Sequence, residues 1–441
     1  MDARLLIAFD MISTQELRSA AWWSLVVLAA SALVSCTSAR RSSGLTAIDA
    51  GGAVAVLAMQ DGGNAGARAS SVVPNGLGVG GTIGSAGGVG GVSGAGMGGA
   101  PSAGGGGDNA GGGAGSPLAG AGGGTAGAAG SPSCMAPVPG SKGANPLFTD
   151  QYTADPAALV YDCTFYIQCG HDEGTTGFVM KEWFLLASTD MVHWTKNVAL
   201  RLSDFAWADA NAWAGQMVVK NGKFYWFVPV NERGSGMALG VAVADSPTGP
   251  FKDAIGKALV DDAFEMSNMG FSTPSDTPYT IDPTVFVDDD GQAYLHYGGF
   301  GRLVVAKLSD DMLSISGKMK EVTPQGFFEA PYLIKRNGTY YEIYAAGQNP
   351  ATIDYATSTS PLGPWKYGGR ILDALPNAPG QDAATNHSGV AEFAGQWYIV
   401  YHVSNGPNAG GTYRREVSID ELTFNPDGSI PKVVPSSGLH F

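Results

Sequence analysis

From about residue 150 onward, short apolar runs alternate with tight turns, and one pattern occurs five times. Each repeat has an apolar run, a turn that often contains Asn-Gly or Asp-Gly, and then a run rich in aromatic residues. Such runs are typical of antiparallel strands joined by hairpins. The repeats begin at Asp155, Ala214, Asp282, Glu329 and His387. A spacing of 47 to 68 residues suits one four-stranded blade per repeat, so we expect an all-β, five-bladed β-propeller.

Loop peptides recur at equivalent offsets from these runs. Residues 246–251 read Ser-Pro-Thr-Gly-Pro-Phe, and residues 360–365 read Ser-Pro-Leu-Gly-Pro-Trp. A single large β-sandwich is the alternative fold, but it does not predict repeated loop peptides. Helical periodicity is weak, because Gly or Pro interrupts almost every apolar window. We therefore expect residues 144–441 to form the propeller.

Three repeats begin with an acid, which the pattern places at the same position in each. The first strand of every blade lines the central channel, so Asp155, Asp282 and Glu329 are expected to meet there. A lone Asp before proline is usually a turn residue, but three acids at one equivalent position argue against independent structural roles. Among crowded carboxyl groups, the most desolvated one keeps its proton while a better solvated one stays ionised. A proton donor that faces an ionised base is the arrangement that glycoside hydrolysis requires.

The N-terminal residues have the pattern of an export signal. Arg18 precedes an apolar run from Ala20 to Val34, which is too short for a stable membrane span and ends just before Cys36. We predict a lipoprotein-type signal peptide over residues 1–36, with Cys36 lipidated; an ordinary secretion signal is the alternative. The protein is then exported, as a cell-surface or outer-membrane lipoprotein held by its acyl chains, or otherwise secreted.

The next segment is dominated by small residues. Glycine makes up 65 of the 441 residues, and 27 of these lie between residues 71 and 130. A stretch of Gly, Ala and Ser has almost no large apolar side chain to bury, so it cannot offset its ordering entropy. We predict that residues 37–143 form a disordered linker that tethers the propeller to the N-terminus.

The charge of the chain limits its partners. With 25 basic and 39 acidic residues, the formal net charge is −14, which argues against nucleic acid or an anionic membrane surface as a partner. A neutral polymer fits better, and we expect the protein to be a monomer.

The four cysteines give no metal-binding spacing. Cys163 lies at a hairpin turn and Cys169 lies six residues further along the next strand, roughly 20 Å away. Since a disulfide needs Cα atoms within about 7 Å, these two are not expected to pair. Cys134, in the linker, can reach either of them.

Six short segments resemble motifs of one enzyme family. They are residues 145–156, 170–173, 281–283, 328–331, 385–388, and 413–415 followed by 425–428. Together they span the whole predicted propeller, which resembles glycoside hydrolase family 43, five-bladed propeller enzymes that act on arabinoxylan, xylan and arabinan. The resemblance is greatest to α-L-arabinofuranosidases and β-xylosidases.

This resemblance implies roles for the three acids. Asp155 would be the general base, Glu329 the general acid, and Asp282 the residue that orients the acid and raises its pKa. The family inverts the anomeric configuration, which implies base and acid carboxyl groups roughly 6.5–9.5 Å apart. The resemblance also implies a polysaccharide or oligosaccharide substrate and no organic cofactor.

Three further residues are candidates for the site. The family resemblance places His387 beside a calcium ion at the propeller centre, although a hydrogen-bonded core histidine is the alternative. Trp213 is placed either to stack on a sugar ring or to pack at the rim between blades. Because Arg414 and Arg415 alternate along a strand, only one faces the channel, and we predict Arg415 to bind substrate.

Two functions of other classes compete with hydrolysis. A propeller that only binds glycans needs no buried, proton-sharing carboxyl groups, although the fold alone permits it. A glycoside phosphorylase on a similar scaffold would need a basic phosphate pocket near the acids. Arg414 and Arg415 are the basic residues that the sequence places near the channel.

Overall fold

The computed structural model describes residues 134–348, 351–375, 385–404 and 411–441. The predicted signal peptide, and the linker as far as residue 133, lie outside the described residues. Within the described ranges, no helix has both the length and the apolar character that a membrane crossing requires.

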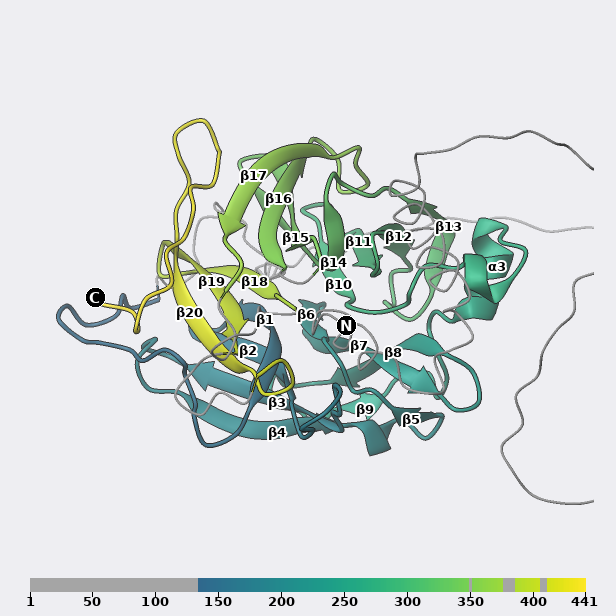
Figure 1. Ribbon diagram of the computed structural model, residues 1–441, viewed down its shortest axis with the longest axis horizontal. Coiled ribbons are helices and arrows are strands. Elements are labelled where there is room, and N and C mark those ends of the chain that lie inside the picture. The colour runs from purple at the N-terminus through teal and green to yellow at the C-terminus, as the bar shows by residue number, and fades with distance from the viewer. Residues whose placement is uncertain (1–133, 349–350, 376–384, 405–410) are drawn as a thin grey trace, which may run out of the picture. The chain divides into compact units, whose positions relative to one another are not determined.

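The described residues form five antiparallel sheets, which confirms the predicted five-bladed β-propeller (Figure 1). The first sheet contains β1 (Thr153–Tyr161), β2 (Thr164–His171), β3 (Glu182–Ser188) and β4 (Thr195–Arg201). The second sheet contains β5 (Ala208–Ala210), β6 (Gln216–Lys220), β7 (Lys223–Glu232), β8 (Met237–Ala244) and β9 (Lys252–Asp253). The third sheet contains β10 (Thr284–Val287), β11 (Ala293–Tyr297), β12 (Val304–Leu308) and β13 (Ile315–Glu321). The fourth sheet contains β14 (Phe327–Arg336), β15 (Thr339–Ala346), β16 (Thr352–Ser358) and β17 (Lys366–Leu372). The fifth contains β18 (Ser388–Phe393), β19 (Gln396–Val403) and β20 (Glu416–Leu422). One short helix, α3 (Asp262–Met269), lies in the connection between the second and third sheets.

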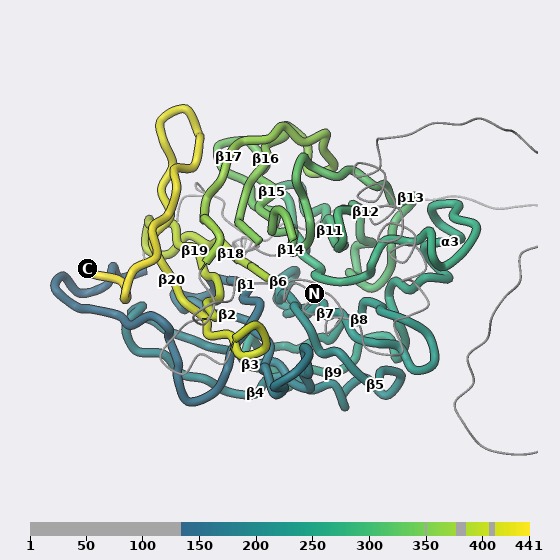
Figure 2. The backbone as a smooth tube through the Cα atoms, in the orientation of Figure 1, coloured from purple at the N-terminus to yellow at the C-terminus, as the bar shows by residue number. Residues whose placement is uncertain are grey.

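The inner strand of each blade contacts the inner strands of its two neighbours. Going round the ring, β1 contacts β6, β6 contacts β10, β10 contacts β14, β14 contacts β18, and β18 contacts β1 again. Figures 1 and 2 show these five strands around the centre, with the outer strands of each sheet further out. The residues that lead into the inner strands are thereby gathered at one end of the ring.

The fifth blade departs from the expected four strands, because its sheet has three. The chain just before β1 packs along its free edge: the Leu147 amide donates to the Val417 carbonyl at 2.8 Å. The Asn145 side chain also donates to the Ile419 carbonyl and accepts from the Ile419 amide, at 2.8 and 2.9 Å. Residues from the beginning of the propeller therefore complete its last blade and close the ring.

Side chains from the inner strands fill the centre of the ring. The Tyr332 hydroxyl of β14 donates to the Ala158 carbonyl of β1 at 2.7 Å, and the Gln216 side-chain oxygen of β6 accepts from the Val285 amide of β10. Tyr332 is buried. These two hydrogen bonds link β14 to β1 and β6 to β10 across the centre of the ring.

A disulfide joins Cys134 to Cys163, with Cα atoms 5.0 Å apart. Cys169 is buried and free, so the expectation that it does not pair with Cys163 is confirmed. Cys134 belongs to the last part of the predicted linker. Residues 140–143, which follow it, make backbone hydrogen bonds to the C-terminal residues Leu439 and Phe441.

Candidate active site

Two of the three predicted acids have the same unusual backbone conformation at the start of an inner strand. Asp155 in β1 and Asp282 just before β10 each precede a proline and have φ angles of 52° and 54°. A left-handed backbone is uncommon for a residue other than glycine, although Asp adopts it more readily than most. Strained residues of this kind cluster at active sites.

Glu329 does not share that backbone position, so the predicted equivalence of the three acids is wrong by one residue. In the fourth blade the left-handed residue before the proline is Ala330, with a φ of 57°. The register of β14 shifts on both sides of Glu329, whereas β1 has a single shift after Ala154. Each shift inserts one residue into a strand, and apolar runs do not reveal it. Glu329 therefore reaches the site from a different point on its strand.

Asp155 is held by a buried arginine. Arg415 Nη1 lies 2.6 Å from Oδ1 of Asp155. The same guanidinium donates to both oxygens of Asp172 from Nε and Nη2, each at 2.9 Å, and the Arg415 amide adds a bond of 3.0 Å to Asp172. Charge-assisted bonds with this forked geometry fix orientation as well as charge. Asp172 thus sets the position of Arg415, and Arg415 sets the position of Asp155.

Two histidines complete the surroundings of Asp155. His402 Nδ1 lies 3.2 Å from the Asp155 amide and 3.3 Å from its Oδ1, and its Nε2 lies 3.2 Å from the Thr385 carbonyl. His387 Nδ1 lies 3.9 Å from Oδ1 of Asp155. Burial lowers the pKa of the His387 imidazole to about 4, although the negative charge of Asp155 acts to raise it. His387 is therefore neutral near pH 7.

The carboxyl of Asp155 is held ionised in spite of its burial. Burial by itself raises the pKa of Asp155, but the positive charge of Arg415 and the hydrogen bond to His402 outweigh it and bring the pKa below its ordinary value. The side chain is 11% exposed, so one part of the carboxylate remains accessible. This group is therefore ionised near neutral pH.

Asp282 and Glu329 are a coupled pair with the opposite tendency. The Ala330 amide donates to Oδ2 of Asp282 at 3.0 Å, which ties Asp282 to the residue after Glu329. Burial, followed by the negative charge of Glu329, raises the pKa of Asp282. Burial, followed by the negative charge of Asp155, raises the pKa of Glu329 to about 8. The pair therefore holds a proton near neutral pH, in the same site as the ionised Asp155.

Trp213 lies next to these residues, and its indole N–H and its carbonyl already form hydrogen bonds within the protein. Its indole N–H donates to the Phe178 carbonyl at 2.9 Å, and its carbonyl accepts from the indole of Trp183 at 2.6 Å. The Phe178 ring meets Trp213 edge-on at 6.5 Å and lies 4.8 Å from the guanidinium carbon of Arg415. Trp213 is only partly buried, and its contacts with Phe178 and Trp183 show the packing between blades.

The two candidate arginines separate as the strand alternation predicts. Arg415 is 2% exposed and joins the acids, whereas Arg414 is less buried and lies over the Tyr152 ring. The role of Asp172 was missed, because its segment, residues 170–173, was noted only as part of the family resemblance. His402 was missed as well. It lies on β19, the strand that pairs with β20, and only its place beside the start of β20, which follows Arg415, would have pointed to it.

The described residues do not by themselves fit a calcium ion. Calcium takes six to eight oxygen ligands, whereas His387 offers a ring nitrogen and the charge of neighbouring Asp155 is already matched by Arg415. In the described part of the chain, no three His, Cys, Asp or Glu side chains are grouped to hold a metal. A calcium ion beside His387 would take most of its ligands from water.

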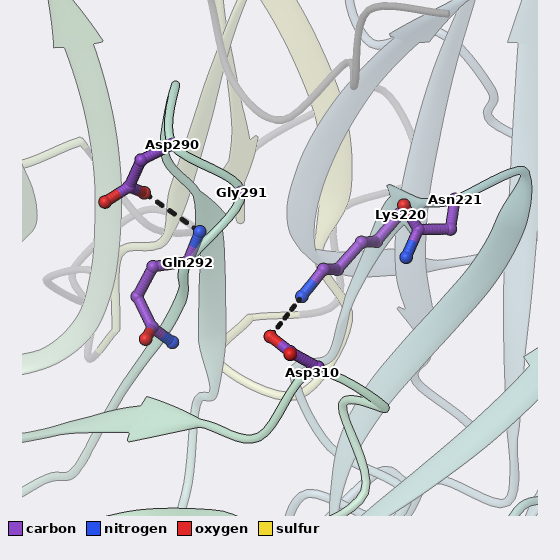
Figure 3. Close-up of a pocket in the computed structure, with 6 residues that line it drawn as sticks. All are labelled: Lys220, Asn221, Asp290, Gly291, Gln292 and Asp310. Carbon is purple, nitrogen blue, oxygen red and sulfur yellow. Dashed lines mark hydrogen bonds and ion pairs between the residues drawn. The ribbon is translucent and has the colours of Figure 1, made fainter. Parts of the chain in front are cut away.

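A surface pocket lies away from these acids. It is lined by Lys220, Asn221, Asp290, Gly291, Gln292 and Asp310 (Figure 3). Lys220 ends β6 and Asn221 follows it, residues 290–292 lie in the turn between β10 and β11, and Asp310 lies in the turn between β12 and β13. Lys220 points toward Asp310 at 3.8 Å, and Asp290 accepts from the Gln292 amide at 2.9 Å. The pocket contains no acid–base pair of the kind described above, so we place the chemistry at the other end of the ring.

Fold and site together define a five-bladed propeller with an ionised carboxylate and two carboxyl groups of raised pKa in one buried site. Residues 144–430 match the family model described as glycosyl hydrolases family 43. The chain therefore belongs to family 43 of the glycosyl hydrolases, enzymes that cleave O-glycosyl bonds.

Curated relatives and solved structures agree with this assignment. An arabinoxylan arabinofuranohydrolase of Bacillus subtilis is 34% identical, over 66% of this chain and 64% of that protein. Xylosidase/arabinosidase 43A of Humicola insolens is 30% identical, over 65% of this chain and 98% of that protein. A family 43 β-xylosidase/α-arabinofuranosidase from a compost metagenome, solved with xylotriose in a calcium-free form, has a TM-score of 0.57 at 32% identity and covers 67% of this chain and 98% of that one. The chain thus spans about two thirds of the first relative and nearly all of the second.

Proposed function

We propose that the protein is an inverting glycosidase that releases arabinofuranosyl or xylosyl residues from arabinoxylan, xylan or arabinan. The observation that carries this proposal is the opposite protonation of two carboxyl groups in one buried site: Asp155 ionised and Glu329 protonated. The printed names of the relatives, an arabinoxylan arabinofuranohydrolase and a xylosidase/arabinosidase, support pentose-containing substrates.

The proposed reaction is a single displacement at the anomeric carbon. Asp155 accepts a proton from a water molecule as the water oxygen forms its bond to that carbon. Glu329 gives its proton to the glycosidic oxygen while the bond from carbon to that oxygen breaks. The sugar leaves with inverted configuration, Asp155 is left protonated and Glu329 ionised, and exchange with solvent restores both.

The neighbouring residues keep the two roles apart. Arg415, fixed by Asp172, holds Asp155 in its charged form and in one orientation. Burial keeps Asp282 and Glu329 protonated up to a higher pH than an exposed carboxyl would be, and the negative charge of Asp155 adds to this effect at Glu329. In this proposal Trp213 and Arg415 also border the sugar that is released.

The surroundings of Arg415 count against a phosphorylase. Its guanidinium already bonds two carboxylates, Asp155 and Asp172, so a phosphate would have to compete with both of them. A propeller that merely binds glycans would have no use for a carboxyl pair whose burial raises its pKa, because each buried acid costs stability. If the protein released no hydrolytic products, the phosphorylase and the glycan-binding propeller would both be favoured over the hydrolase.

The experiment that tests the proposal is product analysis with the whole protein. Arabinoxylan, arabinan and the two nitrophenyl pentosides are incubated with enzyme, and released sugars are identified. Proton NMR spectra recorded during the first minutes identify the anomer that the enzyme releases, before mutarotation mixes the two anomers. Free pentose with inverted configuration is the expected result. Retained configuration, sugar phosphate formed only when phosphate is present, or no product would overturn the proposal.

Three further expectations accompany this function. We propose export through a lipidated Cys36, which mass spectrometry of the mature protein tests. A calcium ion beside His387 remains a prediction, tested by activity and melting temperature before and after chelation, and no step above depends on it. A monomer is expected, and sedimentation measures it directly.

A further inference from the structure

Three aromatic side chains gather beside the segments that carry Asp282 and Glu329. The Tyr279 and Phe300 rings are 4.8 Å apart between centroids, and the Phe300 and Phe328 rings are 5.5 Å apart with an edge-to-face geometry. Tyr279 lies three residues before Asp282, and Phe328 immediately precedes Glu329. We call Tyr279, Phe300 and Phe328 the aromatic platform.

The central residue of the platform is held in an exposed position. Phe300 is 50% exposed, and Tyr367 is the other exposed aromatic residue among the large apolar side chains of the described ranges. Phe300 also has a φ of 51°, which is unusual for a bulky L residue. An apolar side chain kept both exposed and strained, although three of its closest neighbours in sequence are glycines, indicates a functional requirement.

Backbone hydrogen bonds fasten the Phe300 loop to both acid-bearing segments. The Gly298 amide donates to the Ile281 carbonyl, next to Asp282, and the Gly301 amide donates to the Phe328 carbonyl, next to Glu329, each at 2.9 Å. Gly298 has a φ of 139°, and a Cβ there would lie 2.1 Å from the Arg302 carbonyl oxygen, so only glycine fits at this point of the loop. The platform therefore has a fixed position relative to the proton-sharing pair.

The proposed mechanism decides which part of a substrate lies on this side. A general acid must reach the glycosidic oxygen, and that oxygen remains with the leaving group. The leaving group is therefore on the side of Glu329. A pyranose ring presents C–H groups on its faces, and these groups favour contact with the electron-rich face of an aromatic ring.

We infer that the aromatic platform binds the leaving-group part of the substrate, with Phe300 stacking on a pyranose ring of a xylan-type chain. This inference rests on the proposed function and adds the region that recognises the polymer. Remote binding of this kind raises kcat/KM for long substrates and does little for a substrate with a small leaving group.

The test compares two substrates that release the same sugar. One is an arabinoxylan oligosaccharide, or a xylooligosaccharide if xylose is released, and the other is the corresponding methyl pentoside. Phe300→Asn removes the ring and places at the positive φ a residue that tolerates it, so its melting temperature should equal or exceed that of the natural protein. Phe300→Tyr keeps a ring. Tyr367→Asn, on the outer strand β17, is the matched control.

We expect Phe300→Asn to lower the ratio of kcat/KM for oligosaccharide over methyl pentoside by about tenfold, the size of one good aromatic contact. Phe300→Tyr should keep most of the ratio, and Tyr367→Asn should leave it unchanged. An unchanged ratio in a folded Phe300→Asn variant, or an equal fall in Tyr367→Asn, would overturn this inference and leave the proposed function unaffected. An unsubstituted protein that hydrolyses neither substrate would overturn the proposed function and the inference with it.

Discussion

Arg415 Nη1 lies 2.6 Å from Oδ1 of Asp155, although 260 residues separate them in the chain. Arg415 leads into the last strand of the fifth blade and Asp155 lies in the first strand of the first blade, so the contact exists only when the ring is closed. The same closure is supported by the bonds between Leu147 and Val417. Assembly of the proposed base is thus coupled to completion of the propeller.

The first prediction concerns the charge of this arginine. Arg415→Gln alone would leave Asp172 buried and unpaired, which costs about 3–5 kcal/mol, so we pair it with Asp172→Asn. In the double variant the positive charge that opposes the burial of Asp155 is gone, so the pKa of Asp155 rises. The acidic limb of the kcat/KM profile against pH should move up accordingly. An unmoved acidic limb in a folded double variant would show that Asp155 does not set it.

The second prediction concerns the basic limb. Burial raises the pKa of both Asp282 and Glu329, and the negative charge of Glu329 raises that of Asp282 further. Repulsion between two carboxylates is mutual, so a charged Asp282 would also hold the proton on Glu329. Asp282→Asn removes one negative charge, so the remaining proton is lost at lower pH. The basic limb of the profile should move to lower pH, and activity at its optimum should fall as well. A basic limb that moved upward would contradict the assignment of Glu329 as the proton donor.

The third prediction concerns a buried acid outside the reaction. Glu265 in α3 is fully buried and accepts from the Tyr297 hydroxyl at 2.6 Å and the Thr280 hydroxyl at 3.2 Å. Burial raises the pKa of Glu265 from its ordinary 4.5 to about 8. Between these pH values the folded protein keeps a proton that the unfolded chain has lost, so stability falls as pH rises through this window.

The variant Glu265→Gln keeps the shape and removes the titration. The free energy of unfolding should therefore fall less between pH 4.5 and 8 in this variant than in the unsubstituted protein, as measured by denaturant unfolding at several pH values. Glu421, an exposed acid, provides a control substitution of the same type. Parallel pH dependences in the Glu265→Gln variant and the unsubstituted protein would mean that Glu265 is ionised in the folded state.

The fourth prediction concerns the disulfide between Cys134 and Cys163, which closes a loop of 29 residues. Closing a loop of this size restricts the unfolded chain by roughly 3 kcal/mol. Cys134→Ser should lower the melting temperature by roughly 5–10 °C, and addition of a reductant should have the same effect on the unsubstituted protein. Cys169→Ser is the matched control, because Cys169 is buried but unpaired.

The sequence was sufficient for the number of blades and for the convergence of Asp155, Asp282 and Glu329, because hydrophobic periodicity and inner-strand geometry are regular. It was insufficient for the offset of Glu329, since the extra residue in β14 depends on a local backbone distortion at Ala330. It also did not identify His402, whose contact with Asp155 spans 247 residues. Pairings of this kind follow from closure of the ring, and no local pattern marks them.

The central claim is that Glu329 donates the proton and Asp155 accepts one, and the leaving group of the substrate tests it most directly. In Glu329→Gln, kcat/KM for arabinoxylan should fall by about 10²–10⁴-fold, whereas a nitrophenyl pentoside, whose phenol leaves with little protonation, should be partly spared. In Asp155→Asn both substrates should fail together, because the water then has no base. Circular dichroism and melting curves show whether each variant is folded. A folded Glu329→Gln variant that hydrolyses arabinoxylan at a near-normal rate would contradict the account.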